Sequence, residues 1–350
     1  MLVGLATVVS SFAQKVDLDK SYINYVYRGL PHKPLDTNYR TFNVRVEAPS
    51  TINNAMSAES IADRIVLQGW RKAEYGKGHI QITMNFDDLM FEGQNITTRV
   101  SETKNKDGVV TSSKTYYTLT VKYRLSAYYS IRDYQGNTVL GRSELATDRT
   151  ASWSSQEFNS SYEAQNYFNN NRGAISNNLV RKHLDEWTNT LNNSLNYNYG
   201  FPTNTEMALF WTMDSKKHPE NQAWIDQLAT VKKLAAEMDQ NNLSEATKKG
   251  LTDCMSYYKS VIEKYNTDEK AHVKLRYASY YNMSRIALMM DNPSAVAEFA
   301  KGLESTGYDV KDAEKLEKDA KELSDLFTLN KINSTHFPID INKYKTPSGF

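Results

Sequence analysis

The sequence contains a single cysteine, Cys254, among 350 residues, so no internal disulfide can form. Cys254 lies between Leu251 and Tyr258 on a predicted helical stripe. A thiol on such a stripe usually packs as a small apolar group, whereas a reactive thiol needs an exposed and electropositive setting. We therefore interpret Cys254 as a core residue and not as a nucleophile.

The chain also lacks an excess of charge of either sign, with 42 Lys and Arg against 41 Asp and Glu. Residues 1–200 hold 22 basic and 19 acidic residues, which leaves 20 and 22 for the remainder. Proteins that bind nucleic acid or anionic membranes rely on clustered Lys and Arg. The balance in both parts argues against nucleic acid as a main partner and against electrostatic attachment to membranes.

Long hydrophobic runs are missing, and we predict no transmembrane segment. Residues 1–13 form a short apolar run that resembles the central region of a signal peptide, with the small residues Ser11 and Ala13 before a cleavage point at Gln14. The alternative is a buried N-terminal strand. Export without disulfides is more typical of bacteria, so we expect a periplasmic or outer-surface location. No cysteine stands directly after the run, so lipid anchoring is not expected.

Signatures of catalysis are also absent, since the sequence has no nucleophile elbow, zinc-protease motif, phosphate loop or dinucleotide-binding motif. Its six histidines include no pair at zinc spacing. The nearest carboxylate cluster is Asp87, Asp88 and Glu92, which could serve glycoside hydrolysis or a hard metal ion. Solvated acids are normal at the end of a strand, so we predict no catalytic residue, cofactor or metal site.

One amphipathic helix divides the chain. An apolar stripe with steps of three and four includes Ile175, Leu179, Trp187, Leu191 and Leu195. Many asparagines precede it, so we expect a regular helix only over 173–195. Strand patterns come before this helix and helical patterns after it. The sequence predicts an α+β protein with these segments: a signal peptide (1–13), an extended arm (14–40), an α+β domain (41–200), a helical array (203–330) and a tail (331–350).

The first half predicts a mixed or antiparallel sheet with one or two helices. Strands are expected over 41–46 and 79–86, with a helix capped by Ser57 between them. Asn105–Gly108 and Tyr134–Asn137 are typical of hairpin turns, which adds about four antiparallel strands. In outline this half resembles small α/β modules of bacterial envelope assembly proteins.

The second half predicts one helix after another from Thr205 onward, with starts at Pro219, Ser244, Asp268 and Asn292. Residues 280–302 hold an aromatic pair, small residues at steps of four and seven, an Asn-Pro helix start and Gly302. This pattern resembles one tetratricopeptide-type helix pair, although the usual Trp-Leu-Gly start and closing Pro are missing. The resemblance implies an array of helical hairpins that binds proteins or peptides on a concave face.

The chain is rich in tyrosine, with 23 in total. Exposed aromatic rings suit protein interfaces and sugar faces, but strands also favour tyrosine. We therefore predict strand packing for one group, which comprises Tyr116, Tyr117, Tyr123, Tyr128 and Tyr129.

Two functions remain open. The first is a non-catalytic, exported scaffold or adaptor that binds protein partners, and the second is a glycan-binding protein or hydrolase with a site between the two domains. For the first, the candidate contact residues are Trp211, Trp224, Tyr280 and Tyr281.

Overall fold

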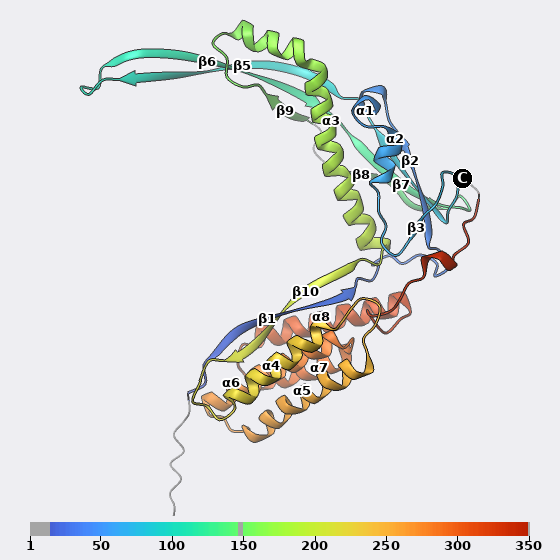
Figure 1. Ribbon diagram of the computed structural model, residues 1–350, viewed down its shortest axis with the longest axis vertical. Coiled ribbons are helices and arrows are strands. Elements are labelled where there is room, and N and C mark those ends of the chain that lie inside the picture. Colours follow the sequence, from blue (N-terminus) through green and yellow to red (C-terminus); the bar gives the residue numbers. More distant parts are fainter. Residues whose placement is uncertain (1–14, 146–149, 349–350) are drawn as a thin grey trace, which may run out of the picture. The chain divides into compact units, whose positions relative to one another are not determined.

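A computed structural model describes residues 15–145 and 150–348 and divides them into two compact units (Figure 1). The helical unit comprises residues 15–34 and 199–340, and the sheet unit comprises the described residues of 35–198 and 341–348. The chain is α+β, as predicted. The predicted arm and tail are each divided between the two units. The predicted signal peptide and cleavage point lie outside the described residues.

The sheet unit contains a five-stranded mixed sheet with the order β3-β2-β4-β7-β8. Its strands are β2 (Thr41–Glu47), β3 (Arg71–Lys72), β4 (Ile80–Phe86), β7 (Ala127–Asp133) and β8 (Thr138–Glu144). β3, β2 and β4 run parallel, whereas β4, β7 and β8 are antiparallel. The predicted strands over 41–46 and 79–86 are confirmed, and Gly136 takes a φ of 89° in the expected turn between β7 and β8.

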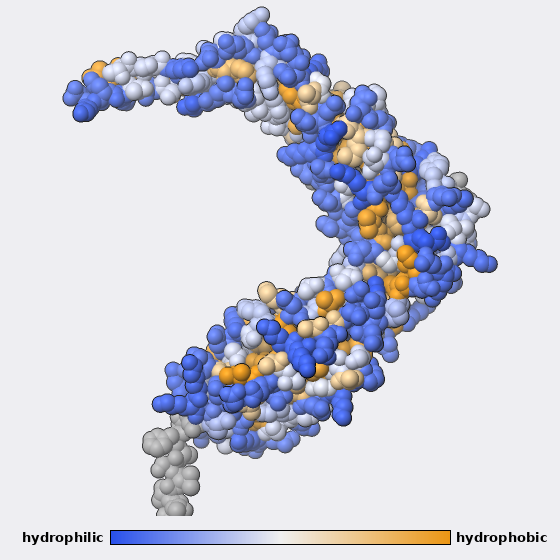
Figure 2. Space-filling view, in the orientation of Figure 1, coloured by the Kyte–Doolittle hydropathy of each residue, from blue (hydrophilic) through white to orange (hydrophobic). Residues whose placement is uncertain are grey.

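A second sheet of three antiparallel strands has the order β5-β6-β9, where we expected one continuous antiparallel set. Its strands are β5 (Met90–Lys104), β6 (Val110–Arg124) and the unpredicted β9 (Thr150–Ser154). Gly108 closes the β5–β6 hairpin with a φ of 79°. Since β9 pairs only with 120–124, most of this hairpin is a two-stranded ribbon. The visible face of the ribbon carries mostly hydrophilic and intermediate residues (Figure 2).

Three helices complete the sheet unit: α1 (Ser50–Ala55), α2 (Ala58–Asp63) and α3 (Ser161–Tyr199). Ser57 caps α2 by accepting a hydrogen bond from the Ser60 N–H at 3.2 Å, as predicted. The expectation that the asparagine-rich start of α3 is irregular is wrong. Ala164 and Phe168 are buried there against the three-stranded sheet, and this tertiary packing outweighs the low helix propensity of asparagine.

Two asparagines of α3 hold the segment after α2 through their side chains. Asn192 accepts from the Val66 N–H at 2.9 Å and donates to the Arg64 carbonyl at 2.9 Å. Asn196 accepts from the Gln68 N–H at 2.7 Å and donates to the Val66 carbonyl at 2.8 Å. One turn apart on the helix, the two amides thus satisfy successive backbone groups of an extended segment, as a neighbouring strand would.

The helical unit contains a long antiparallel ladder of two strands, β1 (Leu18–Arg28) and β10 (Thr203–Met213). The expectation of helix from Thr205 is therefore wrong at this point, and the predicted arm contributes a strand to the same ladder. The inward side chains of Ile23, Tyr25, Ala208 and Phe210 are buried in the helical core. The ladder acquires its stability from this apolar cover.

Five helices follow the ladder: α4 (Asn221–Ala236), α5 (Glu245–Lys264), α6 (Lys270–Met289), α7 (Pro293–Ser305) and α8 (Val310–Asn330). Ser244 caps α5 through the Thr247 N–H at 3.0 Å, and Asn292 caps α7 with Pro293 at the first helical position. These two predicted starts are confirmed, whereas α4 and α6 each begin two residues later than predicted, at Asn221 in place of Pro219 and at Lys270 in place of Asp268. Over the described ranges, no helix combines the length and apolarity needed to cross a membrane. A short 3-10 turn, Ile341–Lys343, lies in the sheet unit.

Candidate functional site

The predicted carboxylate cluster does not converge on a site. Asp87 and Asp88 are exposed, and the Asp88 carboxylate accepts a hydrogen bond from the Thr51 hydroxyl. Glu92 forms an ion pair with Arg124 at 3.0 Å, across the base of the β5–β6 hairpin. Asp88 and Glu92 are thus engaged by different surface partners, and the three acids do not share one.

The four predicted contact residues occupy different environments in the helical unit. Trp224 is fully buried and Tyr281 is 7% exposed, so both belong to the core. Trp211 is half-buried, with its ring centroid 6.0 Å from that of Tyr277. Tyr280 is also half-buried, and it alone among the four lines the groove described below. Two of the four positions are therefore inaccessible to a partner.

The cysteine and the tyrosines that we expected to have structural roles are buried or half-buried. Cys254 is 1% exposed, and burial raises the pKa of its thiol to about 11, which keeps it protonated and inert. In the sheets, Tyr123 and Tyr129 are buried and Tyr116, Tyr117 and Tyr128 are half-buried.

A groove of about 600 Å³ lies over α6, with α5 and α7 as its walls. Half-buried apolar side chains line it from all three helices, namely Met255, Ile262, Tyr280 and Phe299, above the buried Met283. Its polar rim comprises Thr252, Ser256, Lys259, Glu263 and Glu298. An apolar floor inside a polar rim is the arrangement that protein-binding surfaces use.

The absence of a side chain at Gly302 shapes this groove. A β-carbon placed there would lie 2.3 Å from Cε1 of the Tyr280 ring, far inside van der Waals contact. The glycine therefore lets the tyrosine ring pack closely against α7, which brings α6 and α7 together. Close packing of a glycine and an aromatic ring between paired helices matches the pattern noted in the sequence.

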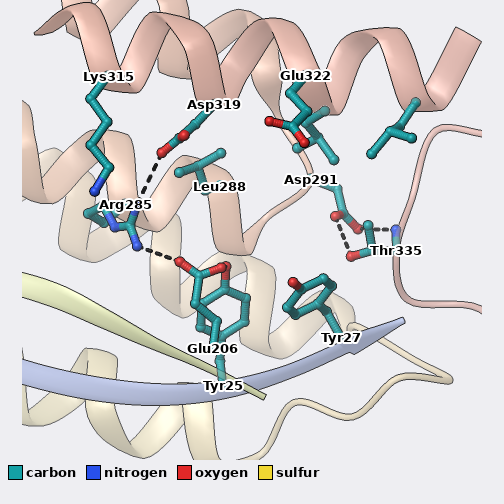
Figure 3. A pocket seen from close by; sticks show the side chains of 12 residues that line it. Tyr25, Tyr27, Glu206, Arg285, Leu288, Asp291, Lys315, Asp319, Glu322 and Thr335 are labelled. Atoms are coloured by element: carbon teal, nitrogen blue, oxygen red, sulfur yellow. Dashed lines mark hydrogen bonds and ion pairs between the residues drawn. The ribbon is translucent and has the colours of Figure 1, made fainter. Parts of the chain in front are cut away.

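A second, polar pocket of about 400 Å³ lies where β1 and β10 meet α6 and α8 (Figure 3). At its base, Arg285 pairs with Glu206 at 2.5 Å and with Asp319 at 3.6 Å. The Tyr25 hydroxyl donates to the other oxygen of Glu206 at 2.9 Å. Glu206, Arg285 and Asp319 thus link β10, α6 and α8 through ion pairs.

The pKa of Asp319 in this pocket is shifted by its surroundings. Burial raises its pKa above the ordinary value, and the nearby Glu206 and Glu322 raise it further. Arg285 and Lys315 act in the opposite direction but do not outweigh burial. Asp319 is therefore protonated more readily than an exposed aspartate.

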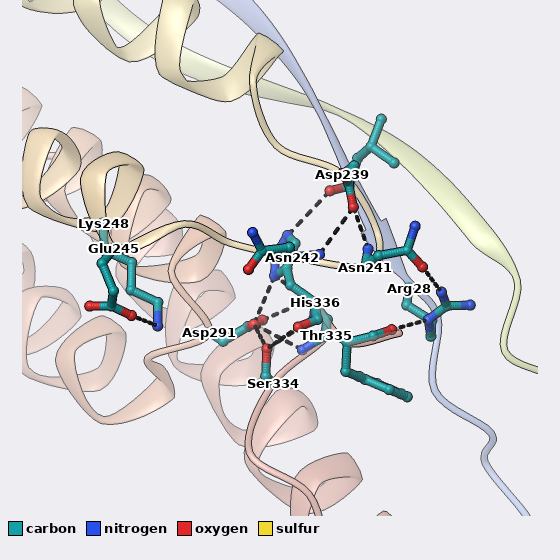
Figure 4. A network of polar contacts seen from close by, with 12 residues as sticks. Arg28, Asp239, Asn241, Asn242, Glu245, Lys248, Asp291, Ser334, Thr335 and His336 are labelled. Atoms are coloured by element: carbon teal, nitrogen blue, oxygen red, sulfur yellow. Dashed lines mark hydrogen bonds and ion pairs between the residues drawn. The ribbon is translucent and has the colours of Figure 1, made fainter. Parts of the chain in front are cut away.

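A buried polar network fastens the segment after α8 to the end of α6 (Figure 4). Asp291, at a left-handed φ of 57°, accepts hydrogen bonds from the Ser334 hydroxyl at 2.7 Å and the Thr335 N–H at 2.8 Å. Its carboxylate also lies 2.9 Å from Nδ1 of His336, whose Nε2 lies 3.2 Å from the Val26 carbonyl. Both ring nitrogens thus have hydrogen-bond partners within the network.

Arg28 extends the same network at the end of β1. Its Nη2 donates to Asn241 at 2.8 Å, and its Nε donates to the Phe337 carbonyl at 3.0 Å. Sequence reasoning did not identify Arg28, Asp291 or His336, because their partners lie 43 to 310 residues away along the chain. The run Asp291-Asn292-Pro293 is a local sequence signal for a turn here, and Asp291 takes a left-handed φ in it.

Comparisons with known proteins do not assign a family. No family model matches the chain, and no curated protein matches it. Among solved structures, the chain is similar to a minor lipoprotein from Acinetobacter baumannii, with 14% identity over 47% of this chain and 98% of that one, at a TM-score of 0.19. A similarity at this level carries no argument about fold or function.

Proposed function

We propose that this protein is a non-catalytic binding protein, a scaffold or adaptor that holds an apolar segment of a partner protein in the groove over α6. The observation that carries the proposal is the cluster of half-buried Met255, Ile262, Tyr280 and Phe299 within a polar rim. Large apolar side chains that remain accessible in a concave surface gain free energy when a partner covers them.

The helix pair α6–α7 supports a likeness to tetratricopeptide arrays as part of this proposal. The Tyr280–Gly302 contact joins two of the aromatic and small residues by which this stretch resembles such a helix pair. In repeat arrays of this kind the ligand lies on the inner face of successive helices. In this proposal the groove over α6, between α5 and α7, is the surface that holds the ligand.

A capture experiment tests the groove. The full-length protein and three single variants serve as bait for extracts of the source organism. Phe299→Glu places a charge in the groove and should abolish capture of the specific partner. Ile225→Glu is the matched control, because Ile225 is 42% exposed on α4 and lies outside the groove. Asp88→Asn should also retain the partner.

The outcome separates the two functional classes. A partner retained by Phe299→Glu would remove the groove from consideration. Loss of function in Asp88→Asn, with the groove variant unaffected, would favour the enzyme interpretation instead. Far-ultraviolet circular dichroism of each variant shows whether the fold is kept.

The polar pocket favours glycan binding or hydrolysis as a second candidate function. The raised pKa of Asp319 beside Tyr25 and Tyr27 is the observation that supports it, because a general acid must be protonated near working pH. Against it, Glu206 is held by both Arg285 and Tyr25. A glycan array should therefore show no binding; binding that Asp319→Asn removes would support this second function.

Export to a bacterial envelope is part of the first proposal. The support is the short apolar run at 1–13 with small residues before Gln14. N-terminal sequencing of the mature protein should begin at Gln14, and a protein from cytosol that still begins at Met1 would contradict export.

A further inference from the structure

The free edge of β2 in the sheet unit leaves backbone groups without partners. β3 pairs with β2 over only two residues, and the last bond between them runs from the Ala73 N–H to the Phe42 carbonyl at 2.7 Å. After Ala73 the chain leaves the edge, and the side chain of Asn43 donates to the Lys77 carbonyl at 2.7 Å. The remainder of β2 therefore has no neighbouring strand on that side among the described residues.

Successive residues of β2 direct their N–H and carbonyl groups to opposite sides, and this alternation identifies the unpaired groups. Thr41 accepts from the His79 N–H on the β4 side, whereas Phe42 accepts on the β3 side. Continuing this alternation, Arg45 faces β4, and Val44 and Val46 direct their N–H and carbonyl groups away from the sheet. Within the described chain, neither valine has a hydrogen-bond partner for these groups.

A groove of about 840 Å³ lies along this edge, between β2 and α2. The helix contributes Ala58 and Ala62, two small residues that leave room above Val44 and Val46. The groove thus combines these small apolar residues with charged ones at its rim. Unpaired backbone groups beside such a groove are complementary to one kind of ligand, an extended polypeptide that adds a strand. A preformed helix would leave the backbone groups of β2 unpaired.

The charges around the groove define the ligand further. Lys72 pairs with Asp63 at 2.9 Å, and Lys77 pairs with Glu74 at 2.6 Å. Glu59, an exposed residue of α2 that lines the groove, has no ion-pair partner among the described residues. The rim therefore presents one uncompensated negative charge, which favours a basic side chain in the ligand.

We propose that the β2–α2 groove is a second docking site, which binds an extended segment of a partner protein as an added strand beside Val44 and Val46. The bound segment directs apolar side chains toward Ala58 and Ala62 and places a Lys or Arg near Glu59. This site is independent of the groove over α6, since it is built from other residues in the other unit.

Peptide selection tests the site. A phage-displayed library of random peptides is selected on the full-length protein, and enriched peptides are synthesised with a fluorophore for titration by fluorescence polarisation. Selected sequences should alternate apolar residues and carry a basic one. Val46→Pro removes the outward N–H without removing a bond to β4 and should weaken binding about tenfold or more. Val46→Thr, which keeps the N–H, is the matched control and should change affinity by less than about threefold.

Three further variants and one measurement distinguish binding in the β2–α2 groove from binding elsewhere and from self-pairing. Ala62→Phe should fill the groove and abolish binding, Glu59→Lys should weaken basic peptides, and Phe299→Glu should leave binding unchanged. Amide hydrogen exchange should show Val44 and Val46 exchanging in the free protein and protected with peptide, while Arg45 is protected in both states. Equal affinity for Val46→Pro and Val46→Thr, failure to select any peptide, or protection that depends on protein concentration alone, as in self-pairing, would each overturn the proposal.

Discussion

The two longest antiparallel ladders of this protein have similar backbone pairing and opposite surroundings. β1–β10 pairs eleven residues on each strand and buries Ile23, Tyr25, Ala208 and Phe210 under the helices. β5–β6 has strands of fifteen residues, and every residue of β5 except the half-buried Phe91 is exposed. Cross-strand pairs alone give an antiparallel ribbon little free energy, so the two ladders should differ greatly in their contribution to stability.

The ribbon is held near its base by contacts that span neighbouring segments. Arg99 forms two hydrogen bonds to Glu157, at 2.7 and 2.8 Å, and its guanidinium lies 4.9 Å from the ring centre of Tyr116. Beyond these contacts the strands have only each other. The comparison indicates that a register can be specified by a turn and cross-strand pairs, whereas stability requires apolar cover.

The largest expected effect is in the covered ladder. Phe210→Ala removes a fully buried ring from β10 and should lower the free energy of unfolding by about 3–5 kcal/mol. Urea titration measures the change, and the labelling rate of Cys254 reports opening of the same unit, because its thiol reacts only when exposed. Similar costs for Phe210→Ala and for Val100→Ala in the ribbon would contradict the comparison.

A smaller effect is expected in the helices that cover this ladder. Gly302→Ala forces a methyl group against the Tyr280 ring and should lower stability by about 1–3 kcal/mol. Gly173→Ala in α3 is the matched control, since nothing lies within 4 Å of the added carbon. The control should gain about 0.5–1 kcal/mol from helix propensity. A loss at both positions would show that backbone conformation, and not the ring contact, determines the result.

A pH-dependent effect is expected at Asp319 on α8. Its pKa is raised in the folded protein, so ionisation above the unfolded value of about 3.8 opposes folding. The stability gained by protonating it is complete below that value and is lost as pH rises through the folded pKa. Asp319→Asn should therefore increase the free energy of unfolding at neutral pH, with the gain vanishing in acid.

The control for this prediction is another carboxylate of the same helix. Asp325 has a side chain that is 66% exposed and pairs with Lys321 at the surface. Asp325→Asn should leave the pH profile of stability close to that of the native protein. A gain for Asp319→Asn that persists unchanged at acid pH would instead indicate a packing effect.

The smallest effect is expected in the exposed ribbon. Replacing residues 101–114 with an Asn-Gly turn joins Val100 to Thr115, a pair in the native register. Because the removed strands are exposed, the free energy of unfolding should change by less than about 0.5 kcal/mol. Thermal unfolding followed by circular dichroism is the measurement. A loss as large as that of Phe210→Ala would mean that the ribbon is part of the stabilising core.

Local signals in the sequence were sufficient for many elements of the fold. Ser57, Ser244 and Asn292 cap helices where expected, because a cap depends on a few neighbouring residues. Gly108 and Gly136 close hairpins for the same reason, since each supplies a positive φ within its own turn. The α+β class followed from a strand-like periodicity in the first half of the sequence and a helical periodicity in the second half.

Only part of the candidate site could be predicted from the sequence. Tyr280 and Gly302 were recognised as part of a helix-pair pattern, but the groove also needs Met255 and Ile262 from the preceding helix. Trp224 and Tyr281 resembled contact residues and are core, because aromatic side chains serve both purposes and composition does not distinguish them.

The sequence by itself determined the turns, the caps and the helical stripes, which depend on neighbours within a few residues. Only the tertiary structure decided that β1 pairs with β10, that Asn192 and Asn196 hold the segment after α2, and that β3 ends early beside β2. In β10 the apolar residues Leu209 and Trp211 follow the buried Ala208 and Phe210 in turn, so no alternation of apolar and polar residues marks the strand. Pairing between distant segments is determined by mutual burial and backbone satisfaction, and neither is expressed in the local pattern of one segment.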